Sequence, residues 1–435
     1  MLEARWRYLR ACVCAMLGTG RTRVTAGRPQ VVVVVSGFPP AVWGGVYRPT
    51  ALCRHADLQR LDLSVIAGPS PAEVSRAGRY LLESLPPALE VHRANVDELA
   101  RYKSFSGHLP RLDGGFERLV AHYTAAIENL VRPPDLVFAS GPRFESFVCA
   151  YLLARRFRAR LILEYRDEWT QCPFPFVTAG PFDRRWERRC LRAADHVIFT
   201  TESQRKHQLG TFPELVPERC SVIPNGWDPA DLAASRQSST RTEHEPEARR
   251  RLAFVGFLGD HTLPDAFLAQ LGEILVRRPD IRQAIRLDFI GNKSPRAADM
   301  LREFACPDVL CLVDQLPKPE ALASMLAADA LLLMNPPDFA RYIPGKLYDY
   351  LAMRRPLLVF GAGGEIQQLV ESHRAGWVVA MNDSSALEAV LGNISRGVLQ
   401  TPDTTDVWLA EHTREVLAKR TWAVMSRVLG PGVTA

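Results

Sequence analysis

The segment YIPGKLYDYLAMRRPLLVF, residues 342–360, places a lysine and an aspartate on the opening turns of an expected helix. Pro344 suits the first turn of a helix, where its missing N–H is not needed. Gly345 adds no side chain, so the free backbone N–H groups of that turn are accessible to an anion. Lys346 adds a mobile positive charge, and Asp349 falls on the same face. This spacing predicts N–H groups and an ammonium for phosphates, with a carboxylate one turn deeper for a ribose diol.

The same two residues have a plainer interpretation. Lys346 and Asp349 are three apart, and an i,i+3 ion pair on a solvated helix face is worth a few tenths of a kcal/mol. On spacing alone this surface pair is the simpler explanation. A ligand site therefore needs support from the elements that would position it.

The first half of the chain alternates apolar runs with helical stretches. The run QVVVVVSGFPP is typical of a strand buried on both faces of a parallel sheet. A helix within 48–59 and a strand at 61–68 complete a βαβ unit, and further apolar runs occur at 134–141, 159–167 and 194–201. The pattern predicts a doubly wound α/β sheet, whose ligands bind beyond the carboxyl ends of the strands.

A second α/β series begins after a polar, Ser/Thr-rich stretch. Its expected strands lie at 251–259, 285–292, 308–315, 329–335 and 355–364. We therefore predict two Rossmann-like doubly wound parallel-sheet domains facing a cleft. The expected parts are a basic extension at 1–28, an N-terminal acceptor-side domain at 29–232, a linker at 233–250, a C-terminal donor-binding domain at 251–400, and a terminal helix at 401–435 that packs back on the N-terminal domain. Neither half carries G-x-G-x-x-G or a Walker loop.

Composition narrows the class of protein. A chain of 435 residues exceeds one ordinary core. The net charge of +6 favours anionic partners such as nucleotides or acidic membranes. A nucleic-acid reader usually concentrates more positive charge on one element, so we expect no nucleic acid partner. The nine cysteines are scattered without C-x-x-C, which indicates reduced thiols in a cytosolic protein. The ten histidines lack metal spacing, and no metal site is expected.

Two basic segments have alternative interpretations. In residues 1–28 apolar side chains recur at helical spacing among arginines, which fits a short helix in a membrane interface or a frayed, solvated tail or misassigned start. In 182–196, five arginines surround a helix with Trp186 and Cys190; this is either a solvated helix face or a basic patch on anionic lipid. The five are Arg184, Arg185, Arg188, Arg189 and Arg192.

Seven stretches in order make residues 30–395 resemble the family-4-type retaining glycosyltransferases, which have the two-Rossmann B fold. Singly each stretch is weak, but IPNGWD and PGKLYDYLA are close to diagnostic. The seven are VSGFPPAVWGGVYRP (35–49), LEYRDEWTQ (163–171), ADHVIFTTES (194–203), VIPNGWDP (222–229), FVGFLGD (254–260), AADALLLM (327–334) and the 342–360 segment.

The resemblance implies roles for particular residues. It places Gly44 and Gly45 near the donor diphosphate and the acceptor, Asn225 and Gly226 at the hinge, and Asp349 on the ribose. Lys346 matches a lysine of the P-G-K-L branch, while Arg166 and Asp167 match R-D-x-W, which Trp169 completes. The expected catalytic residues are Lys346, Asp167 and Arg166; the expected donor-binding residues are Gly44, Gly45, Gly256, Gly345, Lys346, Asp349 and Arg341.

Three positions depart from the family pattern. Arg341 stands where the first glutamate of the family usually contacts the sugar. Phe257 replaces an arginine that often binds phosphate in the second half. Ser140 occupies the place of a common histidine. These changes suggest that Lys346 carries more of the phosphate charge than its family counterparts.

The resemblance implies metal-independent transfer of a hexose-type sugar with retention. No cofactor is expected beyond the nucleotide-diphosphate sugar, and the acceptor would be a glycan or a lipid-linked molecule. Surface polysaccharide or glycolipid assembly is the implied setting, with a cytoplasmic protein that is also peripheral on the inner face of the plasma membrane if a basic patch binds lipid. The alternatives are a same-fold sugar-nucleotide epimerase or hydrolase, and a non-catalytic partner or scaffold protein.

Overall fold

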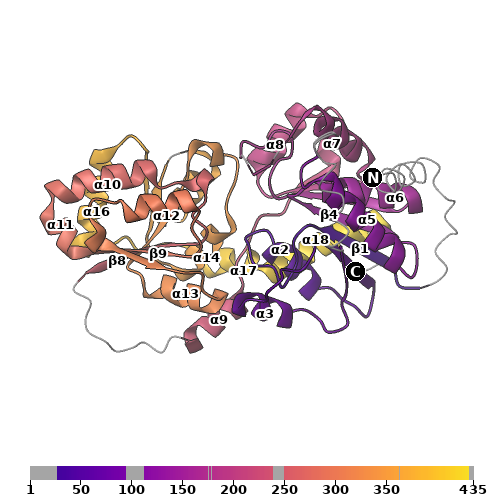
Figure 1. Cartoon of the computed structure of the whole chain (residues 1–435), viewed down its shortest axis with the longest axis horizontal. Helices are drawn as coiled ribbons and strands as arrows, with labels where there is room; N and C mark the ends of the chain where they lie inside the picture. The colour runs from indigo at the N-terminus through magenta and orange to yellow at the C-terminus, as the bar shows by residue number, and fades with distance from the viewer. Residues whose placement is uncertain are drawn as a thin grey trace. The chain divides into compact units, whose positions relative to one another are not determined.

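The chain forms two compact units, each built on a parallel β-sheet (Figure 1). The computed structural model describes residues 27–94, 112–174, 176–177, 179–238, 249–361 and 363–430. Unit 1 comprises the chain up to Pro224 together with the segment from Arg414 onward, and unit 2 comprises Asn225–Thr413. The predicted pair of doubly wound α/β sheets is confirmed.

The sheet of unit 1 has seven strands in the order β3-β2-β1-β4-β5-β6-β7. The chain extends the sheet from β1 in one direction and from β4 in the other, so β1 and β4 flank the switch point. Strand β1 is completely buried because parallel neighbours and helices cover it on all sides. The strands are β1 Gln30–Val35, β2 Asp62–Ala67, β3 Glu90–Arg93, β4 Leu136–Gly141, β5 Arg160–Tyr165, β6 His196–Phe199 and β7 Cys220–Val222.

Helices cover the sheet of unit 1, and the last helix of the chain joins them. Helix α18 (Arg414–Leu429) packs on α2 (Tyr47–Arg54). There the indole N–H of Trp422 donates a buried 3.0 Å hydrogen bond to the carbonyl of Leu52. The other helices are α3 Arg76–Glu83, α5 Phe116–Asn129, α6 Glu145–Phe157, α7 Pro181–Ala193, α8 Glu202–Thr211 and the 3-10 turn η2 Pro217–Arg219.

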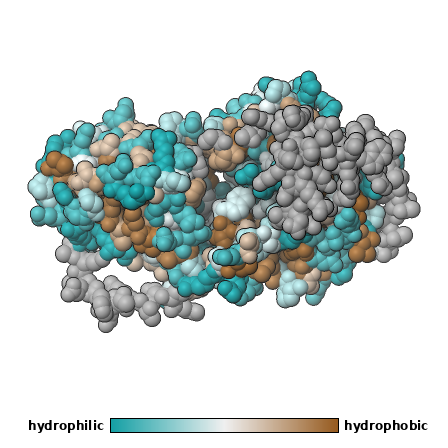
Figure 2. All heavy atoms as spheres, viewed as in Figure 1, coloured by the Kyte–Doolittle hydropathy of each residue, from teal (hydrophilic) through white to brown (hydrophobic). Residues whose placement is uncertain are grey.

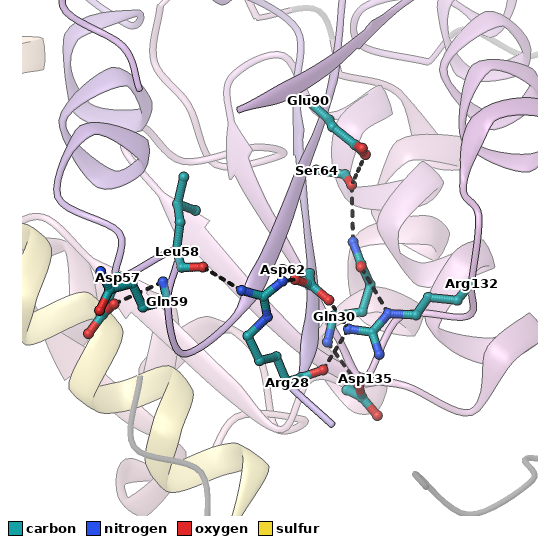
Figure 3. Close-up of polar contacts among 10 residues, drawn as sticks. All are labelled: Arg28, Gln30, Asp57, Leu58, Gln59, Asp62, Ser64, Glu90, Arg132 and Asp135. Atoms are coloured by element: carbon teal, nitrogen blue, oxygen red, sulfur yellow. Dashed lines mark hydrogen bonds and ion pairs between the residues drawn. The ribbon is translucent and has the colours of Figure 1, made fainter. Parts of the chain in front are cut away.

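Polar side chains tie the amino ends of several strands in unit 1 together (Figure 3). The amide of Gln30 donates to the hydroxyl of Ser64, which donates to Glu90 on β3. The backbone N–H of Gln30 donates to Asp135, and Arg132 reaches both Gln30 and Asp62. These polar groups satisfy one another's hydrogen bonds, so their presence at the amino edge of the sheet has a structural explanation. Ligands are expected at the carboxyl edge instead.

The sheet of unit 2 has six strands in the order β10-β9-β8-β11-β12-β13. Its switch point lies between β8 and β11. Leu252 and Phe254 of β8 belong to the apolar cluster on one face, whereas Ala253 and Val255 belong to the cluster on the other. The strands are β8 Arg250–Val255, β9 Ile285–Ile290, β10 Leu310–Val313, β11 Ala330–Met334, β12 Leu357–Phe360 and β13 Gly376–Val379.

The helices of unit 2 lie on both faces of this sheet. They are α9 Pro229–Ser238, α10 Asp265–Arg277, α11 Pro279–Ala284, α12 Pro295–Arg302, α13 Lys318–Ala327, α14 Gly345–Met353, α15 Gly364–Ser372, α16 Ser384–Ser395 and α17 Asp406–Glu411, with 3-10 turns η3 Asp260–Thr262, η4 Pro307–Val309 and η5 Pro337–Phe339. Hydrophilic residues predominate on the visible surface, with hydrophobic ones scattered among them (Figure 2).

The expected domain boundaries need correction. Unit 1 ends at Pro224 rather than at residue 232, because α9 packs against α13 within unit 2. The expected linker at 233–250 therefore begins inside α9, and β8 occupies its last residue; residues 239–248 lie outside the described ranges. Of the expected terminal segment 401–435, α17 belongs to unit 2 and α18 to unit 1.

Two expectations concern membranes and the chain start. The helix expected in residues 1–28 falls almost entirely on residues that the structure does not describe. Among the helices of the described ranges, none combines the length and the apolar character that a membrane crossing needs.

Candidate functional site

The start of α14 in unit 2 has backbone N–H groups outside the helical ladder and open space at Gly345. Pro344 caps the helix in an extended conformation, and the first backbone bond runs from the N–H of Leu347 to the carbonyl of Pro344 at 3.0 Å. The N–H groups of Gly345 and Lys346 therefore precede the helical ladder. A β-carbon on Gly345 would meet no atom within 4 Å. The binding of an anion to this first turn stays a prediction, for which Gly345 leaves room.

Lys346 lies across the end of β8. A β-carbon built on Gly256 would be 3.3 Å from the Nζ of Lys346, and Gly256 has φ of +135°, so this close approach suits glycine. The ammonium is 3.9 Å from the ring centroid of Phe254, a cation–π contact. Within the described part of the chain, Lys346 has no carboxylate partner. Burial lowers its pKa to about 7, so a bound anion would favour the charged form.

Asp349 is buried and already paired. Its Oδ2 binds the Nζ of Lys318, at the start of α13, and the two side chains are 4% and 12% exposed. The i,i+3 pair between Lys346 and Asp349 is therefore wrong, and the two residues point to different partners. Sequence reasoning missed Lys318, although it begins a helix directly after a proline, as Lys346 nearly does.

Two positions of unit 2 depart from the family pattern: Arg341 shortly precedes this helix start in the sequence, and Phe257 follows β8. Phe257 follows Gly256 and is 55% exposed, so an aromatic ring stands at the end of β8. The guanidinium of Arg341 lies 5.9 Å from the ring centroid of Tyr342. Both residues belong to loops at the carboxyl edge of the sheet, where the donor is expected.

In unit 1, Arg166 packs against the loop after β1. Its guanidinium lies 5.6 Å from the ring centroid of Trp43 and donates to the carbonyl of Pro142. A β-carbon on Gly45 would fall 2.0 Å from Nη1 of Arg166, whereas one on Gly44 would meet nothing within 4 Å. Close packing of Arg166 thus accounts for Gly45, and open space remains at Gly44.

Three carboxylates follow one another near the end of β5. Glu164 pairs with Arg48 at 2.8 Å, and Glu168 contacts Nδ1 of His207 at 2.7 Å. Burial raises the pKa of Asp167 to about 6, against the opposing effect of the neighbouring Arg166. Asp167 thus retains the chemistry of a perturbed carboxyl group at a strand end, which is typical of functional positions.

Two other residues of the expected motifs have structural roles. Trp169 is fully buried, stacks on Phe144 with ring centroids 5.1 Å apart, and donates its indole N–H to Asp183. Ser140 donates its hydroxyl to Glu164 at 2.7 Å. These contacts explain both residues without a ligand.

The expected hinge lies at the boundary between the units in the sequence. The carbonyl of Pro224, the last residue of this part of unit 1, accepts a 2.5 Å hydrogen bond from Arg48. The side-chain amide of Asn225, the first residue of unit 2, donates to the carbonyl of Ile343 at 3.0 Å. Gly226 is buried beside it.

The arginines of α7 form one exposed face. Arg188 and Arg192 both pair with Glu214, at 2.7 and 3.1 Å. No acidic partner is present within the described residues for the other three, Arg184, Arg185 and Arg189. The described residues also contain no group of three or more His, Cys, Asp or Glu side chains that could hold a metal ion.

Comparison with known proteins gives a family for part of the chain. Residues 85–226 match the model of the Glycosyl transferase 4-like domain. D-inositol 3-phosphate glycosyltransferase of Kribbella flavida is 26% identical over 190 residues, 41% of this chain and 43% of that protein. The enzyme of the same name from Streptomyces scabiei is 25% identical over 228 residues, 50% of this chain and 49% of that protein. The chain spans less than half the length of these relatives.

Solved structures resemble nearly the whole chain. The structure of sucrose-phosphate synthase from Thermosynechococcus elongatus aligns with 92% of this chain and 99% of its own chain. The TM-score is 0.67 and the sequence identity is 15%. The structure of Anabaena Alr3699/HepE in complex with UDP and glucose aligns with 92% of this chain and 100% of its own chain. The TM-score is 0.61 and the sequence identity is 13%. At these identities the likeness shows the fold.

Proposed function

We propose that the chain transfers a sugar from a nucleoside-diphosphate sugar to an acceptor hydroxyl with retention of configuration, as a member of the family-4-type glycosyltransferases. The match of residues 85–226 to the Glycosyl transferase 4-like domain supports this proposal. The fold supports this proposal, since a neighbour of the same fold has been solved with UDP and glucose. We further propose that the transferred group is a hexose-type sugar and that no metal ion takes part.

The single observation that carries the proposal is the state of Lys346. An ammonium with a lowered pKa and no carboxylate partner in the described residues lies at the start of α14, beside backbone N–H groups that precede the helical ladder and a Gly345 with open space at its β-carbon position. A diphosphate supplies the missing negative charge and accepts hydrogen bonds from those donors. Asp349 lies one turn further along α14 than Lys346 and pairs with Lys318. It is the proposed contact for the ribose.

The proposed chemistry needs charge neutralisation more than an attacking side chain. As the nucleoside diphosphate leaves, the anomeric carbon gains oxocarbenium character and the phosphate gains charge. Lys346 and the N–H groups of α14 stabilise that phosphate, while Arg166 and Asp167 act on the acceptor side. Removing one such charged contact typically costs about 3 kcal/mol, so Lys346→Ala should lose roughly a hundredfold in turnover.

The proposed acceptor is a glycan or a lipid-linked molecule in surface polysaccharide or glycolipid assembly. The exposed arginines of α7 for which the described part of the chain supplies no acidic partner support a docking role at an anionic membrane surface. Replacing Arg184, Arg185 and Arg189 by Gln should abolish salt-dependent binding to vesicles of anionic lipid. The double change of Arg188 and Arg192, which already pair with Glu214, is the matched control and should weaken binding less. Equal losses would argue against the proposed surface.

The deciding experiment is a panel of UDP-, GDP- and ADP-sugars. Sugar transfer with nucleotide release, and a product whose anomeric configuration by NMR matches the donor, is the expected result. Nucleotide release without an acceptor would indicate a hydrolase, and isomerised donor an epimerase. Binding without any turnover would indicate a non-catalytic partner protein. A product with inverted anomeric configuration would support sugar transfer but refute the proposed retention.

A further inference from the structure

Asn335 is a buried amide at the switch point of unit 2. It directly follows β11, the strand that pairs with β8, at the carboxyl edge of the sheet. The residue is 1% exposed, yet neither Oδ1 nor Nδ2 of its side chain has a hydrogen-bond partner among the residues that the structure describes. An amide in such a place is an exception, because buried polar atoms are normally paired.

The backbone around Asn335 is held firmly. Its N–H donates to the carbonyl of Phe360 at 2.8 Å, continuing the ladder between β11 and β12. The carbonyl of Asn335 lies where a β-carbon on Gly361 would come within 1.9 Å, so the two strand ends are tightly packed. The unpaired amide is therefore not the result of a loosely placed loop.

For the stability of the protein without a ligand, an apolar side chain would suit this position better than an amide. Burying an amide without partners is unfavourable, and the five residues of β11 that precede Asn335 are all buried and apolar. A residue type that does not suit its buried surroundings, at the end of a strand, is typical of a functional position.

Asn335 also lies on the path to the start of α14. Residues 336–344 connect it to Gly345 and Lys346, and β8, the neighbouring strand, ends at the Gly256 over which Lys346 extends. The amide and the ammonium thus belong to the same strand-end region of one sheet.

We propose that the side-chain amide of Asn335 binds a hydroxyl group of the sugar nucleotide, an inference that rests on the function proposed above. The amide presents one acceptor and two donors. A phosphate oxygen would satisfy the donors alone and leave Oδ1 unpaired, whereas a hydroxyl both donates and accepts. Lys346 and the helix start already provide for the phosphates.

The hydroxyl belongs either to the ribose or to the transferred sugar. Titration with UDP and with UDP-glucose separates the two, provided that the panel identifies uridine as the base; otherwise the matching pair of nucleotide and nucleotide sugar is used. A loss seen with both ligands assigns the ribose, and a loss confined to the nucleotide sugar assigns the transferred sugar.

The informative variant is Asn335→Leu, which keeps the size and removes the polar atoms. We expect the melting temperature of the unliganded protein to rise, because an unpaired buried amide is gone. We expect the affinity for the nucleotide sugar to fall by about tenfold or more, since a hydrogen-bonded ligand group loses its partner. A structural residue would not show this combination of higher stability and weaker binding.

Gln208 provides a matched control. It is a fully buried amide in α8 of unit 1, and both of its side-chain polar atoms also lack partners in the described ranges. Gln208→Leu should raise the melting temperature in the same way and leave the affinity for the nucleotide sugar unchanged. If Asn335→Leu does not fold, Asn335→Ala answers the same question at lower side-chain volume.

Three results would overturn the inference. Unchanged affinity in Asn335→Leu, at any melting temperature, would show that the ligand does not use the amide. A fall in both melting temperature and affinity in Leu and Ala variants would assign the amide a structural role. Absence of any nucleotide binding by the unmodified protein would instead refute the proposed function itself, and this inference with it.

Discussion

The side-chain amide of Asn225 donates a 3.0 Å hydrogen bond to the carbonyl of Ile343. The bond joins the first residue of unit 2 to the loop that precedes α14. Since Pro344 and Gly345 follow directly, the carbonyl of Ile343 helps to fix the first turn of the helix. The chain entering unit 2 is thus tied to the proposed phosphate site by one bond.

Asn225→Asp tests that bond. The carboxylate loses the donor and turns a negative charge toward the Ile343 carbonyl, so we expect the free energy of unfolding to fall by about 1–3 kcal/mol and donor affinity to fall as α14 shifts. Urea denaturation and calorimetric titration measure the two effects. Asn129→Asp breaks a similar amide-to-carbonyl bond in unit 1 and should leave donor affinity intact. Unchanged affinity in Asn225→Asp would contradict the connection.

The pair Lys318–Asp349 predicts a pattern across three variants. Both side chains are largely buried, so removing either partner takes away the opposite charge that the other faces at this site. Lys318→Met or Asp349→Asn should each lower the free energy of unfolding by about 3–5 kcal/mol, and the double variant should recover most of that loss. Arg302→Met, which breaks an exposed pair with Asp299, should cost under about 1 kcal/mol. Strictly additive losses would show that the pair does not interact.

Donor binding should depend on pH through Lys346. Its pKa is about 7 before a ligand binds, and a diphosphate raises it, so binding above pH 7 takes up a proton. Affinity for a nucleotide sugar, whose phosphates do not titrate near neutrality, should be constant below pH 7 and fall about tenfold per pH unit above it. Calorimetry in buffers of different ionisation enthalpy measures the proton uptake. Lys346→Met should bind weakly without pH dependence; a pH-independent unmodified protein would refute this linkage.

The carboxyl group of Asp167 predicts how stability changes with pH. Its folded-state pKa of about 6 lies above the ordinary 3.8, so the folded protein binds the proton more tightly than the unfolded chain. Its contribution to stability is present below pH 4 and is lost as pH rises through about 6. Asp167→Asn should therefore gain stability relative to the unmodified protein between pH 4 and pH 8, measured by urea denaturation.

Asp280 supplies a control whose pH dependence lies outside this interval. A hydrogen bond from Arg278 lowers its pKa below the ordinary 3.8, so its contribution to stability is complete above pH 4 and is lost only in more acidic solution. The difference in stability between Asp280→Asn and the unmodified protein should therefore be constant between pH 4 and pH 8. The raised pKa values of Glu145 and Glu187 give all variants a common slope. A difference between Asp167→Asn and the unmodified protein that does not vary with pH would contradict the perturbed pKa.

The central strands were predictable because burial on both faces requires continuous apolar runs. Strands β3, β7 and β13 were missed, and all three lie at the edge of a sheet. Their residues are mostly half-buried, and stretches such as EVHR and CSV carry no apolar run. The domain boundary was missed for another reason, because α9 reads as polar linker until its packing against α13 is seen.

The site was predictable as far as local rules reach. Proline, glycine and lysine at a helix start fixed the expected phosphate position, and Lys346 does lie at an open first turn. The partners supplied by other strands and helices were not predictable: Lys318 beside Asp349, Phe254 beneath Lys346, and the unpaired amide of Asn335. For Asn335, the only signal in the sequence was a polar residue at the end of the apolar run ALLLMN.

Lys346 is the residue on which the proposed function depends most. The most direct measurement is the dissociation constant of the best nucleotide sugar from the panel, for the unmodified protein and for Lys346→Met at pH 6, where Lys346 is protonated. We predict that Lys346→Met binds roughly a hundredfold more weakly, since it removes the charged partner of the diphosphate. Equal dissociation constants for the two proteins would contradict a diphosphate site at the start of α14.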